Sequence, residues 1–207
     1  MDALKVLQLE AETIWPPVDD GFGGGGLGDN TIAVTAVTYD GQSITMAGAT
    51  PLSPDTAVAV SIARCWLLER TTSYAAPPGL RLVSTAGSYQ PPSRWSTTEW
   101  YSLMNGGQGP WVALVDGDRV QSLAHCARLT QQAAEVGVQT EDEARGRGLA
   151  SVTVSAWAEL MRQRGLTLFY SALEANQSSH RVAAKCHATP LGRLSRVFAQ
   201  PSSEEPR

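Results

Sequence analysis

The stretch EVGVQTEDEARGRGLASVTVSAWAELMRQRG, residues 135–165, decides the fold. It opens with the alternation of a strand and then carries an apolar stripe at helical spacing, at Leu149, Val152, Ala156 and Leu160. Between strand and helix lies RGRGLA, residues 145–150, with two glycines and two arginines. Such a corner offers close backbone approach, unpaired helix N–H groups and cationic donors. The segment therefore predicts an anion site, most simply for a phosphate.

Length and composition restrict the rest. The chain has 207 residues, 43% of them hydrophobic, which suffices for one sizeable core. A net charge of −4 without a basic block argues against nucleic acid as a partner. The sequence shows no apolar run of membrane-spanning length and no secretion signal, so we expect no membrane association and a cytoplasmic location. Cys65, Cys126 and Cys186 show no metal or disulfide spacing, so we expect no metal and three buried thiols.

The first half of the chain predicts mixed structure. An amphipathic helix is expected over residues 2–14 and a hairpin over 31–49, turning at Asp40-Gly41. Residues 53–72 are expected to form a second helix, capped by Ser53 or Asp55.

The second half has a clearer order. After a short strand within 77–95 and a short helix at 96–104, it predicts strands within 111–129 on both sides of Asp116-Gly117, a strand at 133–140, the helix after RGRGLA, a strand at 166–173, a helix at 178–188 capped by Ser178 or Ser179, and a strand at 191–198. The order β-β-β-α-β-α-β indicates an α/β fold in which antiparallel hairpins lead into a parallel crossover.

A second glycine-rich segment, GFGGGG at residues 21–26, literally fits a dinucleotide-binding pattern. It follows two prolines and two aspartates rather than an apolar strand, and it precedes β-rich sequence rather than a helix. We interpret it as a surface loop, because adjacent carboxylates would repel a pyrophosphate.

Arg145, Gly148 and Ala150 fit R-x-x-G-x-A, and Asn176 and Ser179 fit N-x-x-S. In this order the two motifs resemble the GNAT superfamily of acyl-CoA-dependent N-acyltransferases, over roughly residues 96–192. The segments AEVGVQTEDEARGRGLA and FYSALEANQSSHRVAAK look like a GNAT branch that includes amino-antibiotic acetyltransferases. The resemblance implies a mixed, mostly antiparallel central sheet, flanked by helices, whose fourth and fifth strands are parallel and splay apart.

The resemblance also implies the donor site and the domain plan. It assigns the binding of acetyl-CoA or another acyl-CoA to Val138, Gln139, Thr140, Arg145, Gly146, Arg147, Gly148, Leu149, Ala150, Asn176 and Ser179. Residues 91–200 would form the acyl-CoA-binding core, preceded by a degenerate extension at 1–90 and followed by a polar tail at 201–207.

The catalytic groups are less determined. Strand alternation places Glu135, Gly137 and Gln139 on one face, so Glu135 is the first candidate for the base and His125, on the neighbouring strand, the second. Many GNAT members have a tyrosine seven residues after the asparagine, where this chain has Ala183. Tyr170, Ser179 or water are then the candidates for the general acid.

The acceptor expected from the resemblance is the amine of a small molecule, in specialised metabolism or resistance. Trp95, Trp100, Tyr101 and Trp111 either wall its pocket or belong to the core. The acyl donor could be acyl-CoA or an acyl group on the phosphopantetheine of an acyl carrier protein. The oligomeric state is also open, and a homodimer is one alternative. Because Ala183 replaces the tyrosine, a non-catalytic acyl-CoA-binding sensor is the alternative function. His187 stands where GNAT members usually have glycine, and it either shapes the helix end or approaches the donor.

Overall fold

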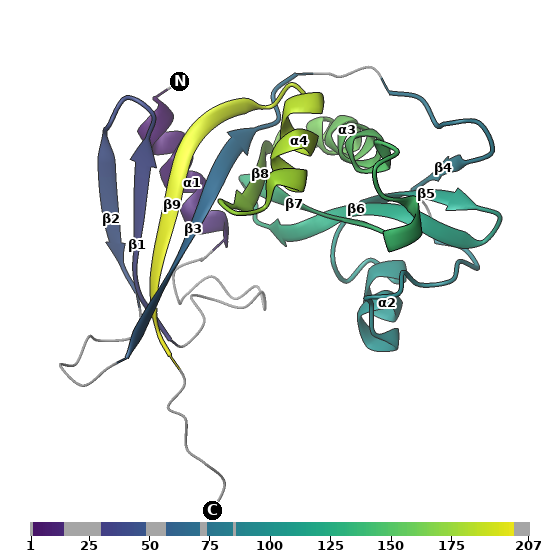
Figure 1. Cartoon of the computed structure of the whole chain (residues 1–207), viewed down its shortest axis with the longest axis horizontal. Helices are drawn as coiled ribbons and strands as arrows, with labels where there is room; N and C mark the ends of the chain where they lie inside the picture. The colour runs from purple at the N-terminus through teal and green to yellow at the C-terminus, as the bar shows by residue number, and fades with distance from the viewer. Residues whose placement is uncertain (1, 15–29, 49–56, 71–73, 85, 201–207) are drawn as a thin grey trace, which may run out of the picture. The chain divides into compact units, whose positions relative to one another are not determined.

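The computed structural model of the chain describes residues 2–14, 30–48, 57–70, 74–84 and 86–200. Nine strands and four α-helices lie in this described part (Figure 1). They form two compact units whose segments alternate along the chain. The first unit holds the chain up to Cys65, residues 171–175 and the chain from Pro190; the second holds Trp66–Tyr170 and Asn176–Thr189. The domain boundaries expected near residues 90 and 200 stay a prediction.

The first unit is an antiparallel sheet with one helix against it. Its strands follow in the order β2-β1-β9-β3, with bounds β1 (Thr31–Thr38), β2 (Ser43–Ala47), β3 (Val58–Leu67) and β9 (Thr189–Ala199). Helix α1 (Ala3–Ile14) packs against β1 and buries Leu7 and Ala11. The hairpin predicted at Asp40-Gly41 is confirmed, since Gly41 has a φ of 88° and its N–H donates to the Thr38 carbonyl at 3.1 Å.

The second unit carries the mixed sheet predicted from the C-terminal half. Its strand order is β8-β7-β6-β5-β4, and all neighbours are antiparallel except β7 and β8, which are parallel. The element order β-β-β-α-β-α-β and the α/β fold class are confirmed. The bounds are β4 (Arg81–Val83), α2 (Thr97–Met104), β5 (Trp111–Asp116), β6 (Arg119–Leu129), β7 (Ala133–Thr140), a 3₁₀ turn (Asp142–Ala144), α3 (Leu149–Arg162), β8 (Thr167–Leu173) and α4 (Gln177–Lys185).

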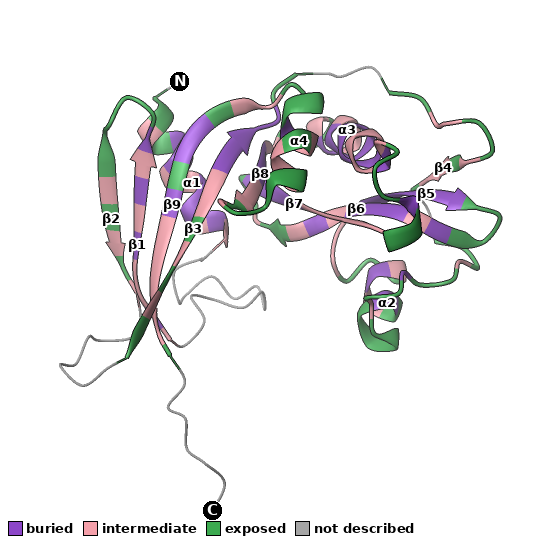
Figure 2. Ribbon diagram, in the orientation of Figure 1, coloured by how far each residue is buried: buried purple, intermediate pink, exposed green. Residues whose placement is uncertain are grey.

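Different helices cover the two faces of this sheet (Figures 1 and 2). On one face, α2 buries Trp100 against Trp111 of β5. On the other, α3 buries Leu149 against Leu114 of the same strand. Positions 111 and 114 reach opposite cores because side chains alternate along a strand. The apolar core of the second unit is thus divided between two layers, one on each face of its sheet.

The helix predicted over residues 53–72 is wrong, because β3 occupies Val58–Leu67. Along its first five residues, exposed Val58, Val60 and Ile62 alternate with half-buried neighbours, which is the period of a strand. Branched side chains at Cβ favour that extended backbone over a helix. The proposed caps Ser53 and Asp55, like the glycine segment 21–26, lie outside the described residues.

The three cysteines are free and buried, as expected. Within the described ranges, no helix combines the length and the apolar character needed to cross a membrane.

Candidate functional site

The candidate site begins where two parallel strands separate. Strands β7 and β8 pair at Ala133–Thr167, Ala134–Leu168 and Glu135–Phe169, and within the described residues their pairing ends there. From Val136 to Thr140, β7 pairs with β6 alone. Its other edge therefore has backbone N–H and C=O groups that β8 does not satisfy. The predicted splay of the two strands is confirmed, and it creates an edge suited to an extended, amide-containing ligand.

The glycine corner follows β7 through the 3₁₀ turn. Gly146 and Gly148 both take left-handed backbone conformations, with φ of 77° and 79°, which glycine adopts without strain. Gly148 is the N-cap of α3, and no side chain caps the helix there. Because the first N–H groups of a helix have no intrahelical acceptor, they are available to an anion at the positive end of the helix dipole.

Open space borders both glycines. A methyl group built on Gly146 would meet no atom within 4 Å, and one built on Gly148 would meet only Lys185 Nζ at 3.6 Å and Ser151 Oγ at 3.9 Å. The polypeptide therefore leaves room for a group that approaches this backbone closely. The donors, the space and the nearby cations together fit the pyrophosphate of an acyl-CoA.

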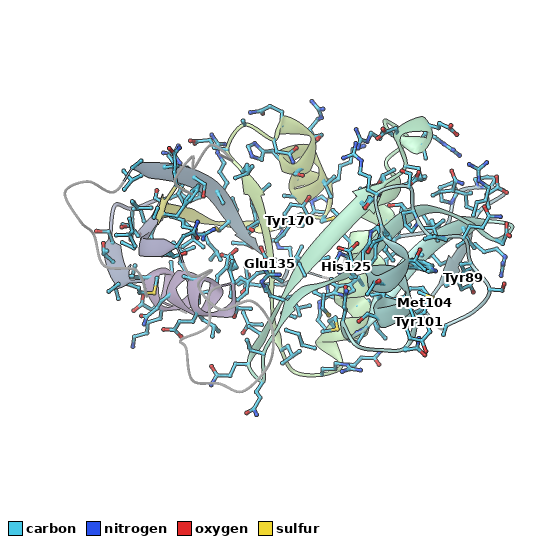
Figure 3. All side chains as sticks on the ribbon, turned by 90° about the horizontal axis from the view of Figure 1, so that it is seen from below. Tyr89, Tyr101, Met104, His125, Glu135 and Tyr170 are labelled. Carbon is cyan, nitrogen blue, oxygen red and sulfur yellow. The ribbon has the colours of Figure 1, made fainter. Side chains whose placement is uncertain are left out.

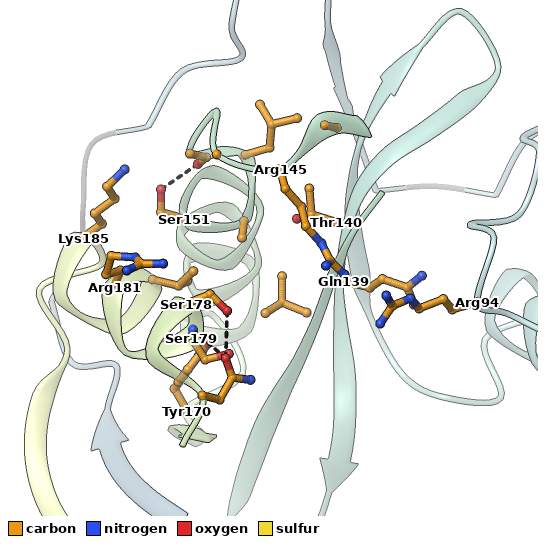
Figure 4. Close-up of a pocket in the computed structure, with 18 residues that line it drawn as sticks. Arg94, Gln139, Thr140, Arg145, Ser151, Tyr170, Ser178, Ser179, Arg181 and Lys185 are labelled. Atoms are coloured by element: carbon orange, nitrogen blue, oxygen red, sulfur yellow. Dashed lines mark hydrogen bonds between the residues drawn. The ribbon is translucent and has the colours of Figure 1, made fainter. Parts of the chain in front are cut away.

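The corner opens into a pocket of about 750 Å³ (Figure 4). All the predicted donor-binding residues line it except Arg147, whose side chain is exposed outside the pocket. None of the described lining residues is acidic. Four of the lining side chains are cationic, namely Arg94, Arg145, Arg181 and Lys185. The pocket is therefore electropositive and suited to a polyanionic ligand.

Asp142, beside the pocket, neutralises part of this charge. Its Oδ1 atom accepts from Arg145 at 2.8 Å and from Arg94 at 3.2 Å. The same segment is fixed a second time, because the Ser93 N–H donates to the Glu141 carboxylate at 2.9 Å. The chain before α2 is thus joined at two points to the segment that precedes the glycine corner.

The opposite wall comes from β8 and α4. Asn176 is the N-cap of α4, and its Oδ1 accepts from the Ser179 N–H at 3.1 Å and from the Ser178 hydroxyl at 2.8 Å. The predicted caps Ser178 and Ser179 are therefore wrong: both lie inside the helix and donate to Asn176, whose short carboxamide reaches the first turn. Asn176 and Ser179 nevertheless line the pocket, as predicted.

Tyr170 of β8 lines the same wall and is almost fully buried. Burial raises the pKa of its phenol to about 12, and a side-chain hydrogen bond with Ser179 opposes that rise. The phenol is therefore protonated at neutral pH, and the raised pKa makes it a weaker proton donor than an exposed tyrosine.

The two candidate bases lie outside the donor pocket. Glu135 is buried and belongs to the last residue pair before β7 and β8 separate. His125 pairs across β6 and β7 with Gly137, so the alternation of β7 puts Glu135 and His125 on the same face of the sheet, the face of α2 (Figure 3). A methyl group on Gly137 would lie 2.7 Å from His125 Nε2, so only glycine leaves room for the ring.

The surroundings of His125 disfavour its protonated form. Burial lowers its pKa, while its Nδ1–H donates to the Cys126 carbonyl at 3.2 Å. This bond leaves Nε2 with the lone pair. Trp95 packs edge-on against the ring, with centroids 5.0 Å apart. Trp100 and Trp111 are core residues of the α2 face, Trp95 is partly buried beside them, and Tyr101 is 70% exposed.

Comparisons with known proteins agree with this geometry. The sequence profile of the GNAT acetyltransferase family matches residues 86–186. Residues 86–186 form a GNAT acetyltransferase domain. No match exists among curated proteins.

Solved structures show the same fold at low sequence identity. A GNAT-family protein from Novosphingobium aromaticivorans DSM 12444 has 19% identity and a TM-score of 0.53, over 74% of this chain and 71% of its own. A GNAT-family acetyltransferase from Colwellia psychrerythraea has 15% identity and a TM-score of 0.51, over 70% of this chain and 59% of its own. A GCN5-related N-acetyltransferase-like protein from Streptococcus suis 89/1591 has 13% identity and a TM-score of 0.51, over 95% of this chain and 99% of its own.

The two departures from the GNAT pattern have structural explanations. Ala183 is fully buried and does not line the pocket, so its position contributes packing rather than a proton donor. His187 has a φ of 51° and follows α4, where the Ala188 N–H donates to the Ala183 carbonyl at 3.1 Å. It thus takes the left-handed position that usually ends a helix with glycine. The side chain is exposed and does not line the donor pocket, which answers the question raised by the sequence.

Three pocket cations of this GNAT domain were missed by sequence reasoning. Arg181 and Lys185 stand four residues apart in α4, and that spacing on a helix could have indicated a shared face. Arg94 gives no such signal, because it lies 48 residues before its partner Asp142.

Proposed function

We propose that the chain is an N-acyltransferase that moves an acyl group, in the simplest case acetyl, from acyl-CoA to the amine of a small molecule. The pocket carries this proposal. It lies where β7 and β8 separate, it borders the uncapped start of α3, and four cations but no described carboxylate line it. The GNAT acetyltransferase match over residues 86–186 supports acyl transfer as the activity of this domain.

Each part of the donor has a matching part of the site. The N–H groups at Gly148 and the first turn of α3, with Arg145, would hold the pyrophosphate. The free edge of β7 at Val138 and Thr140 would bond to the amides of the pantetheine arm. A backbone N–H near Val138 or Gln139 would polarise the thioester carbonyl.

The chemistry requires one proton acceptor and one proton donor. Glu135 would remove a proton from the acceptor's ammonium group, directly or through a water, with His125 as the second candidate. The amine nitrogen then bonds to the acyl carbon, the carbon–sulfur bond breaks, and the nitrogen releases its second proton to water, from which the proton donor is later reprotonated. Tyr170, protonated at neutral pH, would give a proton to the departing thiolate, with Ser179 as its hydrogen-bond partner.

A thiol-release assay tests this function. Purified protein is incubated with acetyl-CoA and longer acyl-CoAs against a set of small-molecule amines, including amino-antibiotics, and free thiol is followed with time. We expect release that depends on both donor and acceptor, with an amide product of matching mass. Release independent of every amine, or none with any donor, would contradict the proposal. An acylated carrier protein in place of acyl-CoA tests the other donor class.

One observation favours a second function. Ala183 leaves α4 without the tyrosine that many GNAT members use to protonate the thiolate, which suits an acyl-CoA-binding sensor. The same assay separates the two functions when it is paired with calorimetry. Tight acyl-CoA binding without turnover for any amine identifies the sensor, whereas acceptor-dependent release identifies the enzyme.

A further inference from the structure

The proposed donor contacts leave the two pocket cations of α4 without an assigned ligand. Arg181 and Lys185 project from successive turns of α4, line the pocket and are exposed (Figure 4). Among the described residues neither makes a salt bridge, whereas Arg94 and Arg145 share the carboxylate of Asp142. Lys185 Nζ also stands beside Gly148, 3.6 Å from where a side chain would begin. The α4 pair therefore offers two uncompensated charges next to the glycine corner.

The charge of the pocket exceeds what one phosphate diester needs. Its four cations, less the one carboxylate of Asp142, leave a surplus of about three positive charges around the cavity. A phosphopantetheine arm on a carrier protein brings a single phosphodiester charge. CoA brings its diphosphate and, in addition, a phosphomonoester on the adenosine 3′ oxygen that carries between one and two charges at neutral pH.

We propose that Arg181 and Lys185 form a second anion subsite that binds the 3′-phosphate of CoA and so selects CoA thioesters over carrier-bound ones. The inference rests on the proposed function, because it concerns the same donor. CoA thioesters and carrier-bound thioesters share the thioester, the pantetheine and a first phosphate, so the glycine corner alone does not distinguish them. The second subsite would distinguish them. Arginine and lysine on one helix face are suited to a terminal phosphate with three free oxygens.

Calorimetry with CoA and 3′-dephospho-CoA tests the subsite, since the two ligands differ only in that phosphate. We expect the wild-type protein to bind CoA about 10-fold more tightly than dephospho-CoA at low salt. In the double variant Arg181→Gln/Lys185→Gln, the ratio of the dissociation constants for dephospho-CoA and CoA should fall to about one. The affinity for dephospho-CoA should stay within about threefold of that of the wild-type protein. Arg119→Gln/Arg164→Gln, which removes two exposed arginines outside the pocket, controls for net charge and should keep the wild-type ratio.

The outcomes separate this inference from the function beneath it. Equal wild-type affinities for the two ligands would overturn the subsite and leave the acyltransferase intact. A double variant that keeps the wild-type ratio, or that loses both ligands equally, would also overturn it, because the pair would then be uninvolved or would serve the diphosphate. Failure of the wild-type protein to bind either ligand would overturn the proposed function itself.

Discussion

The two faces of the sheet in the second unit are built from the same strands and offer opposite environments. On the α3 face, Gly146 and Gly148, which both have positive φ values, and four cationic side chains line a pocket of about 750 Å³. On the α2 face, Trp100 and Trp111 belong to the buried core, and burial beside Trp95 lowers the pKa of His125. Because β7 presents alternate residues to its two sides, one sheet can border both a cationic pocket and an apolar core.

The largest effect is expected from Gly148→Asp, which should abolish acyl-CoA binding measured by calorimetry. A carboxylate at the start of α3 would occupy the open space and repel the pyrophosphate. Gly165→Asp is the matched control, because Gly165 also has a positive φ, of 71°, and space around it, but lies after the other end of α3. If Gly148→Asp binds acyl-CoA normally while circular dichroism shows a folded protein, the α3 face is not the donor side.

Glu135→Gln tests the opposite face. Turnover with acceptor should fall by roughly 10²–10⁴-fold, while donor affinity stays nearly unchanged, because the amide keeps its size but loses the basic lone pair. The rising limb of the pH–rate profile should shift or vanish. His125→Gln, measured in parallel, should lose much less. Near-normal turnover of Glu135→Gln across the pH range would remove Glu135 from the role of base and make His125 the candidate.

Arg145→Ala should weaken CoA binding by on the order of 10- to 100-fold, the range expected for a charge-assisted hydrogen bond. Arg147→Ala provides a neighbouring control, because Arg147 is exposed and does not line the pocket. Calorimetry of both variants with CoA shows whether binding depends on the position of the arginine in the pocket or only on the net charge of the segment. Equal losses from the two substitutions would mean that the corner attracts CoA only through its net charge.

His187→Gly should stabilise the protein by about 0.5–1 kcal/mol, because glycine occupies the left-handed helix end without the steric cost that histidine bears. Urea denaturation measures the free energy of unfolding. Donor affinity should stay at the wild-type value, since His187 does not line the donor pocket. A loss of CoA affinity in this variant would show that His187 serves the ligand rather than the helix.

The smallest effect concerns His125 and pH. Its folded-state pKa lies below the ordinary value of 6.5, so the unfolded chain binds the proton more readily. The corresponding stability is present above about pH 6.5 and is lost as pH falls towards the folded-state pKa. Urea denaturation at pH 7.5 and 5.5 should therefore show a smaller acid-induced loss for His125→Gln than for wild type. Identical losses would mean that the α2 face does not hold His125 neutral.

The sequence predicts which residues line the pocket better than it predicts the rest of the site, for a local reason. Strand, glycines, arginines and helix are contiguous between residues 135 and 165, so their chemistry can be read within one segment. Asn176 and Ser179 also follow from a short motif, although the capping role of Asn176 was given to the wrong residues. The N-cap is the last residue with a non-helical backbone before the helix, and Asn176, Ser178 and Ser179 lie within four positions and are all favourable cap residues.

Errors and omissions arise where distant residues determine the outcome. The run VAVSIARCWL, residues 58–67, is short and apolar, and such a run does not distinguish a strand from a helix until its pairing is known. Arg94 enters the pocket only because folding brings it to Asp142. Nothing near either residue in the sequence signals that contact.

The uncapped start of α3 has a consequence for heat resistance. Because no side chain caps these first N–H groups, an anion that binds them stabilises the folded state, so ligand binding and folding are coupled. A ligand at 100 times its dissociation constant adds about 2.7 kcal/mol to the folded state. Melting temperature should therefore rank acyl-CoAs by affinity before any acceptor is known, and the acyl group that raises it most indicates the natural donor.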